Sequence, residues 1–157
     1  MKDQNGFTLI EIIVILVIIG IGMTAGIGGY ITQVRMSQLK RDANRVVDDL
    51  DRARQLTMAR DTKGVYCDTN SYSLEFIGAT GNYNLRHTCG LTVSVETATK
   101  LESTQFVSNS TINFTEPYGA PAGVSTFLLK HPSLNKCIVF TVPVTGPVTI
   151  SEPQGCF

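Results

Sequence analysis

Glu11 is the one charged residue in a long apolar segment. No charge occurs between Ile12 and Val34, where isoleucine, glycine and valine predominate. As a helix, this segment would span roughly 35 Å, enough to cross a hydrocarbon core of about 30 Å. A carboxylate near the bilayer centre costs about 2.5–3.5 kcal/mol and therefore predicts a cationic partner. A neighbouring copy, shifted along the membrane normal, would supply an amine; the alternative is an acid at the membrane edge that reaches the headgroups.

Four cysteines form a second reactive set: Cys67, Cys89, Cys137 and Cys156. Their even number and the lack of Cys-x-x-Cys spacing suit two disulfides in an oxidising compartment. Three pairings are possible. We favour Cys67–Cys89, which would join neighbouring early strands, and Cys137–Cys156, which would anchor the carboxy terminus. Each bond would contribute about 2–4 kcal/mol. A four-thiolate metal site is the rival, disfavoured by the spacing and the compartment.

The two histidines, His87 and His131, do not point to catalysis. A Cys–His nucleophile would need a free thiol, which disulfide formation removes. We expect ordinary surface or turn histidines. The sequence has no glycine-rich phosphate loop, HExxH pattern or acid-rich calcium loop, so we expect no enzyme activity, no cofactor and no metal. A nucleic-acid partner is not expected, because the basic residues cluster before residue 64.

The apolar helix that carries Glu11 changes character at Gly20. Glycines crowd the next positions, each costing about 1 kcal/mol relative to alanine in a helix: Gly20, Gly22, Gly26, Gly28 and Gly29. The spacing of Gly22 and Gly26 would suit a close helix–helix contact in the membrane. The interpretation that we favour is a weak point around Gly26, Gly28 and Gly29, which unwinds when copies of the chain pack together.

An amphipathic helix follows over residues 35–63. Its apolar residues recur at steps of four and three and form one stripe: Leu39, Ala43, Val46, Leu50 and Ala53. Val47 and Leu56 widen the stripe, whereas charged residues that include Asp42 and Arg52 are expected on the other faces. The stripe predicts a helix that packs on a sheet and ends near Gly64.

From Val65 the apolar period shifts to two, which predicts short strands separated by turns. The strands are expected at Val65–Asp68, Tyr72–Ile77, Tyr83–Thr88, Leu91–Glu96, Thr111–Thr115, Ser125–Lys130, Lys136–Val142 and Val148–Ser151. The clearest loop is Pro117–Gly123. A long helix followed by antiparallel strands predicts an α+β fold, in which a small antiparallel sheet buries the stripe of the helix.

The segment Gly6-Phe7-Thr8-Leu9-Ile10-Glu11 resembles the class III signal of type IV pilins and pseudopilins. The resemblance implies the type IV pilin fold, cleavage by a prepilin peptidase between Gly6 and Phe7, and N-methylation of the new terminal Phe7. It also implies that Glu11 pairs with the terminal amine of a neighbouring subunit. The expected divisions are a leader at 1–6, a membrane and assembly helix at 7–34, the amphipathic helix at 35–63 and a disulfide-stabilised β-rich head at 64–157.

The resemblance further implies a function and a set of partners. We expect a structural subunit, a minor pilin, of a type IV pilus-like filament. Its partners would be other pilin or pseudopilin subunits, the prepilin peptidase and methyltransferase, the inner-membrane assembly platform and the lipid bilayer. The helix that runs directly into Gly64-Val65-Tyr66-Cys67 resembles H-type minor pseudopilins, so a minor pseudopilin of a type II secretion system is the alternative. A further alternative is a membrane-anchored adhesin or DNA-uptake receptor that never polymerises. The Cys137–Cys156 pairing resembles the carboxy-terminal disulfide loop of many pilins.

The expected location rests on the cysteines rather than on charge. Eight basic residues follow the span before Gly64, whereas the leader has only Lys2 opposed by Asp3. A positive-inside count would therefore place the amino terminus outside. Disulfides and the resemblance place the head outside instead. We expect a single-pass protein of the inner membrane before assembly, and an extracellular or periplasmic filament afterwards.

Replacing Gly6 with a bulky leucine is expected to leave residues 1–6 attached to the chain, because the predicted cleavage follows this glycine. The intact mass of the protein extracted from membranes measures this directly. Unchanged removal of the leader from the Gly6→Leu variant would contradict the cleavage assignment.

Overall fold

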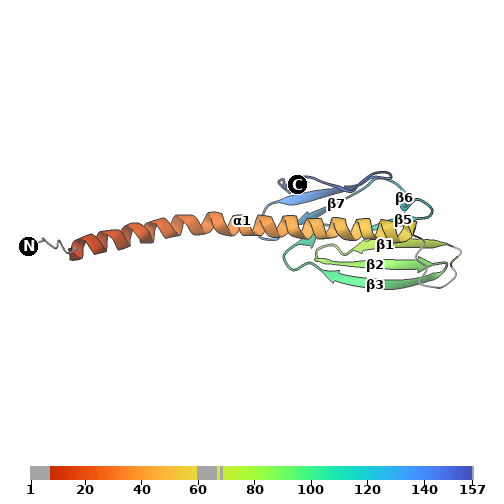
Figure 1. The fold of residues 1–157 in the computed structure, drawn as a ribbon, viewed down its shortest axis with the longest axis horizontal. Coiled ribbons are helices and arrows are strands. Elements are labelled where there is room, and N and C mark those ends of the chain that lie inside the picture. Colours follow the sequence, from red (N-terminus) through yellow and green to blue (C-terminus); the bar gives the residue numbers. More distant parts are fainter. Residues whose placement is uncertain (1–7, 60–66, 68, 157) are drawn as a thin grey trace, which may run out of the picture. The chain divides into compact units, whose positions relative to one another are not determined.

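The structure, a computed structural model, describes residues 8–59, 67 and 69–156, and the side chains of residues 24–27 are not described. Within these residues, one helix, α1 (Leu9–Met58), is followed by nine strands (Figure 1). The chain divides into two compact units, Met1–Val34 and Arg35–Phe157. The first contains the amino-terminal half of α1. The second contains the rest of α1 and every strand, and we refer to it as the head unit.

α1 is continuous over 50 residues and includes all five glycines between Gly20 and Gly29. The helix continues through the glycines although the flanking residues are mainly isoleucine and valine, whose helix propensity is only moderate. In the isolated chain the glycine-rich stretch is thus helical. Unwinding at Gly26, Gly28 and Gly29 stays a prediction for the packed state.

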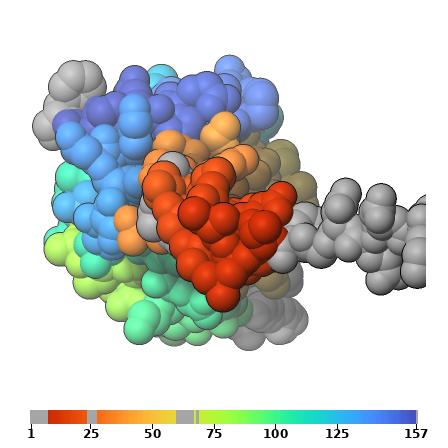
Figure 2. Space-filling view, turned by 90° about the vertical axis from the view of Figure 1, so that its left-hand side faces the viewer, coloured from red at the N-terminus to blue at the C-terminus, as the bar shows by residue number. Residues whose placement is uncertain are grey.

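The predicted stripe on the second half of α1 is confirmed. Its five residues are fully buried: Leu39, Ala43, Val46, Leu50 and Ala53. Val47 and Leu56 are partly buried against the same core. In Figure 2 this part of α1, coloured orange, lies between the blue carboxy-terminal strands and the green strands that precede them. The spacing of the stripe therefore places one side of the helix against the sheets.

The strands form two antiparallel sheets, where the sequence predicted one. The first has the order β3-β2-β1-β5-β6 and the second the order β4-β7-β8-β9. Their bounds are β1 (Asn70–Phe76), β2 (Asn82–Cys89), β3 (Thr92–Lys100), β4 (Gln105–Phe106), β5 (Ser110–Thr115), β6 (Ala120–Pro121), β7 (Ser125–Lys130), β8 (Cys137–Val142) and β9 (Thr149–Ile150). The fold is α+β, as predicted.

Aromatic rings join the two sheets into one core. The ring of Phe76 on β1 stacks on Phe127 of β7 at 4.4 Å and lies 4.8 Å from Phe106 of β4. Phe127 in turn stacks on Phe140 of β8 at 4.5 Å. All four side chains are at most 2% exposed. Close ring pairs of this kind add about 0.5–1.5 kcal/mol each beyond the area that they bury.

Polar groups of α1 also bond to the strands and their connections. Asp42 is buried, contrary to the prediction, because its Oδ2 accepts a hydrogen bond at 2.9 Å from the buried hydroxyl of Thr104. The Tyr83 hydroxyl donates to Asp49 at 2.5 Å. Burial, and then the Asp49 carboxylate, raise the pKa of Tyr83 above its usual value. These bonds satisfy acids that face the core and fix the helix along its length.

Most predicted strands are confirmed, with two corrections. The expected loop Pro117–Gly123 contains β6, and β4 was not predicted at all. Both strands have only two residues, too few to show a period in the sequence. The turn before β6 requires Gly119, whose φ is +58° and whose added Cβ would lie 2.8 Å from the Arg54 carbonyl oxygen. The expected strand Val65–Asp68 falls largely outside the described residues.

Two disulfides tie the strands together, in the pairs favoured from the sequence. Cys67 bonds Cys89 at the end of β2, across 22 residues. Cys137 at the start of β8 bonds Cys156, across 19 residues. Loops of this length correspond to about 3 kcal/mol each in the chain-entropy account.

Replacing Leu50 with alanine is expected to lower the free energy of unfolding of the head unit by about 2–5 kcal/mol, because it opens a cavity under the stripe. Chemical denaturation of the full chain in detergent, followed by the fluorescence of the buried tyrosines, measures the change. Arg52→Ala on the exposed side of the same helix serves as the control. Equal stability of the two variants would contradict the packing.

Candidate assembly site on the amino-terminal helix

The amino-terminal half of α1 is apolar on all sides. From Leu9 to Met23 its large apolar side chains are between 42% and 79% exposed. A helix that is apolar all round is stable only when lipid or other helices cover it. By length and composition, α1 is the one helix among the described residues that could cross a membrane. Its uncovered surface is the first component of the site.

Glu11 lies in the first turn of this helix. Its backbone N–H donates to the Thr8 carbonyl oxygen at 3.1 Å and approaches the Thr8 hydroxyl at 3.4 Å. The helix dipole favours an anion in this turn. The Glu11 side chain is exposed, and within the described residues no cation lies within 4.0 Å of its carboxylate. The site therefore presents a carboxylate without an ion-pair partner in the described chain, next to a broad apolar surface.

Thr8 is a residue of the site that the sequence analysis missed. It caps the helix, and Thr8-Leu9-Ile10-Glu11 matches the capping-box pattern, in which a threonine and an acid three residues later satisfy free N–H groups. That pattern was visible in the sequence. It gives Glu11 a local role in starting the helix in addition to any role between subunits.

The other predicted site residues fall in different surroundings. Gly6 and Phe7 lie outside the described residues. Gly28 and Gly29 are in the helix, and a Cβ added to either would meet nothing within 4 Å. Gly26 is helical in its backbone. Among these positions the structure brings Glu11 and the apolar surface together, while the four cysteines lie in the head unit.

Both histidines are buried, so the expectation of surface histidines is wrong, although His131 does begin a turn. His87 follows Tyr83 and Leu85 on the buried side of β2, an alternation that the sequence displays. Its ring stacks on Tyr72 at 4.6 Å, and its Nε2 lies 2.8 Å from the Asn70 side-chain oxygen. His87 is thus a core residue.

The described residues contain no candidate metal cluster. Within this part of the chain, no three His, Cys, Asp or Glu side chains lie close enough together to hold an ion. All four cysteines are in disulfides, so none of them offers a thiolate.

A family model described as the prokaryotic N-terminal methylation motif matches residues 1–27. The amino terminus therefore carries the methylation signal that is typical of type IV pilins and pseudopilins. No curated protein and no solved structure is significantly similar to the chain. The pilin signal implies processing by a prepilin peptidase and assembly with other pilin subunits. Together with the apolar helix, it fits a subunit that is anchored in the membrane before assembly.

Acidification is expected to destabilise the head unit through His131. Burial, and then the nearby Arg35 cation, lower the pKa of this imidazole, and Asp42 partly offsets them. The folded state therefore binds fewer protons than the unfolded state, and stability falls as the pH drops below the usual histidine value of about 6.5. Denaturation of the full chain at pH values of about 7.5 and 5.5 measures the loss.

The His131→Asn variant keeps an acceptor for the Ser133 N–H, which donates to His131 Nδ1 at 3.1 Å. It should lose less stability on acidification than the natural chain. An equal loss in both proteins would show that other groups cause the effect.

Proposed function

We propose that the protein is a minor pilin of a type IV pilus-like filament. A prepilin peptidase removes residues 1–6 and Phe7 becomes an N-methylated amino terminus. The apolar helix stores the subunit in the inner membrane with the head outside. An assembly platform then extracts the subunit into the filament, where Glu11 pairs with the Phe7 amine of a neighbour.

The observation that carries this proposal is the isolated carboxylate of Glu11 on an uncovered apolar helix. Lipid or neighbouring helices must cover that surface, and in either environment an unpaired carboxylate is unfavourable. A terminal amine in the same apolar layer faces the same penalty. Pairing the two groups removes both penalties, and it can occur between subunits displaced along the helix axis. The ion pair would then fix the position of one subunit along its neighbour and also attract the two subunits to each other.

The glycine-rich stretch supports a change of the helix during assembly. Gly28 and Gly29 have open space where a side chain would be, so neighbouring helices can approach closely there. The same residues lower the free energy needed to unwind the helix. We assign Gly26, Gly28 and Gly29 as the segment that extends when subunits pack.

A minor pseudopilin of a type II secretion system is the second candidate. The sequence pattern from the amphipathic helix into Gly64-Val65-Tyr66-Cys67 favours it. Recovery of the protein in sheared surface filaments would favour the pilus, whereas a defect limited to protein secretion in its absence would favour the pseudopilin. A membrane-anchored receptor that never polymerises would be insensitive to loss of Glu11.

The Glu11→Val variant should reach the membrane in normal amounts but fail to enter filaments. Breaking a buried ion pair by removing one partner costs about 3–5 kcal/mol, which corresponds to a loss of incorporation of roughly 150- to 5,000-fold. Immunoblots of membranes and of sheared filaments measure the two quantities. Ile10→Val at the preceding position is the control for apolar substitution in the same turn. Normal incorporation of Glu11→Val would refute the ion pair.

A further inference from the structure

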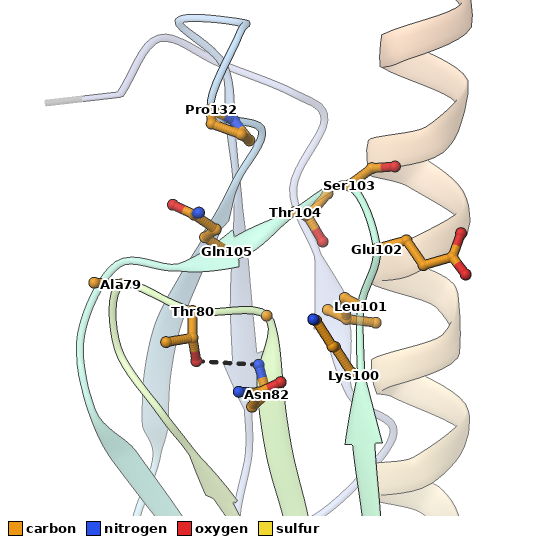
Figure 3. Close-up of a pocket in the computed structure, with 11 residues that line it drawn as sticks. Ala79, Thr80, Asn82, Lys100, Leu101, Glu102, Ser103, Thr104, Gln105 and Pro132 are labelled. Carbon is orange, nitrogen blue, oxygen red and sulfur yellow. Dashed lines mark hydrogen bonds between the residues drawn. The ribbon is translucent and has the colours of Figure 1, made fainter.

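Two adjoining hollows open at the end of the head unit where β3 and β7 finish. The larger is about 430 Å³ and is lined by residues that include Lys130, His131, Ser133 and Asn135. The smaller is about 320 Å³ and includes Lys100 and Glu102 in its lining. Gln105 and Pro132 line both. Figure 3 shows the lining of the smaller hollow, with Glu102 at α1 and with Gln105 and Pro132 on the side away from the helix.

Cations without acidic partners line these hollows or lie near them: Lys100 and Lys130 are in the linings, and Lys136 follows the lining residue Asn135. Among the described residues, Arg35, Lys100, Lys130 and Lys136 form no ion pair, whereas Lys40 pairs with Glu152 at 3.0 Å. Arg35 lies near enough to His131 for its charge to act on that ring. Glu102 is the one acid of the two linings. We call Arg35, Lys100, Lys130 and Lys136 the basal cations.

The larger hollow has the donors that an anionic oxygen requires. The Lys130 ammonium, the Ser133 hydroxyl and the amides of Gln105 and Asn135 supply N–H and O–H groups, and none of its lining residues is acidic. Its volume lies in the range of small-molecule sites, about 300–1,000 Å³. Leu134 and Pro132 add apolar surface at the tip of the same turn. Phosphate next to apolar material is the chemistry of a phospholipid at the membrane interface.

Chain connectivity determines which membrane is within reach. Arg35 follows directly on the apolar segment that ends at Val34, so it lies within one headgroup layer of any bilayer that this segment crosses. The Thr104 hydroxyl bonds Asp42, two turns after Arg35, and Thr104 directly precedes Gln105 of the larger hollow, so this hollow lies near the start of the head unit. Binding of a free phosphate ion would gain nothing from a position at the membrane surface or from the apolar side chain of Leu134.

We propose that the basal cations and the larger hollow bind the headgroup phosphates of anionic phospholipids in the membrane that α1 crosses. This inference rests on the membrane stage of the proposed function. Arg35, the first basic residue after the span, then belongs to the contact between the head unit and the outer leaflet. Each cation at an anionic surface strengthens binding about five-fold.

The test uses the full chain in nanodiscs of phosphatidylcholine, with or without phosphatidylglycerol. Hydrogen exchange of the backbone amides of residues 131–136 reports contact, and it should slow about five-fold or more in the anionic discs. High salt should remove the difference, because the contact is electrostatic. Equal exchange in the two kinds of disc would overturn the proposal.

Matched charge reversals locate the contact. Lys130→Glu and Lys136→Glu should abolish the slowing, whereas Arg52→Glu, roughly 25 Å farther along α1 than Arg35, should retain it. Glu102→Gln should increase the slowing of exchange, because it removes the one acid of the two linings, which would repel the lipid phosphates. Unchanged exchange in the β1 amides shows that each variant is folded. Equal effects of Lys136→Glu and Arg52→Glu would overturn the proposal.

Two further arms separate the alternatives. Inorganic phosphate added to phosphatidylcholine discs should not reproduce the slowing; if it does, the site binds free phosphate and the lipid proposal fails. The Glu11→Val variant should keep the full lipid effect, because insertion does not need that carboxylate. A protein that lacks the lipid effect but assembles normally would refute this inference alone, whereas a chain that does not enter the discs would refute the membrane stage of the proposed function.

Discussion

One helix carries two surfaces with opposite requirements, and the rest of the protein depends on this difference. Along its second half, the apolar stripe is fully buried by the two sheets. Along its first half, apolar side chains are exposed on every side. Burial of apolar area contributes about 25 cal/mol per Å², so the uncovered half has a large unmet driving force for contact with lipid or with sibling helices. In the proposed filament, pairing of Glu11 with a neighbour's amine would give that otherwise non-directional force a preferred position.

The small head unit is stabilised by several devices that act together. The aromatic stack from Phe76 through Phe127 to Phe140 connects the two sheets, and a disulfide closes a loop in each. A domain of this size buries a modest fraction of its surface, and covalent bonds compensate for the limited core.

Local periodicity made much of the structure predictable. The stripe from Leu39 to Ala53 and strands such as Ser125–Lys130 could be found because each repeats its apolar residues at a fixed interval. The division into two sheets could not, since it depends on partners far away in the chain. The strands β4 and β6 could not because two residues are too few to show a period. Asp42 was placed in solvent because its buried partner, Thr104, lies 62 residues later. His87 and the Thr8 cap were missed despite local signals, an alternation in β2 and a capping box.

The arrangement of helix and sheets also has a mechanical consequence. From Leu39 to Thr57, α1 is held by the buried stripe, by the Asp42–Thr104 and Asp49–Tyr83 bonds, and by the Arg54 guanidinium, which donates to the carbonyl oxygens of Pro143 and Gly146. Tension applied along the helix axis would load these attachments simultaneously, in shear. Peeling, in which bonds fail one after another, would require a sideways pull. A subunit pulled lengthwise by its amino-terminal half would thus keep its head folded at this force. The same force applied sideways would break these contacts one after another.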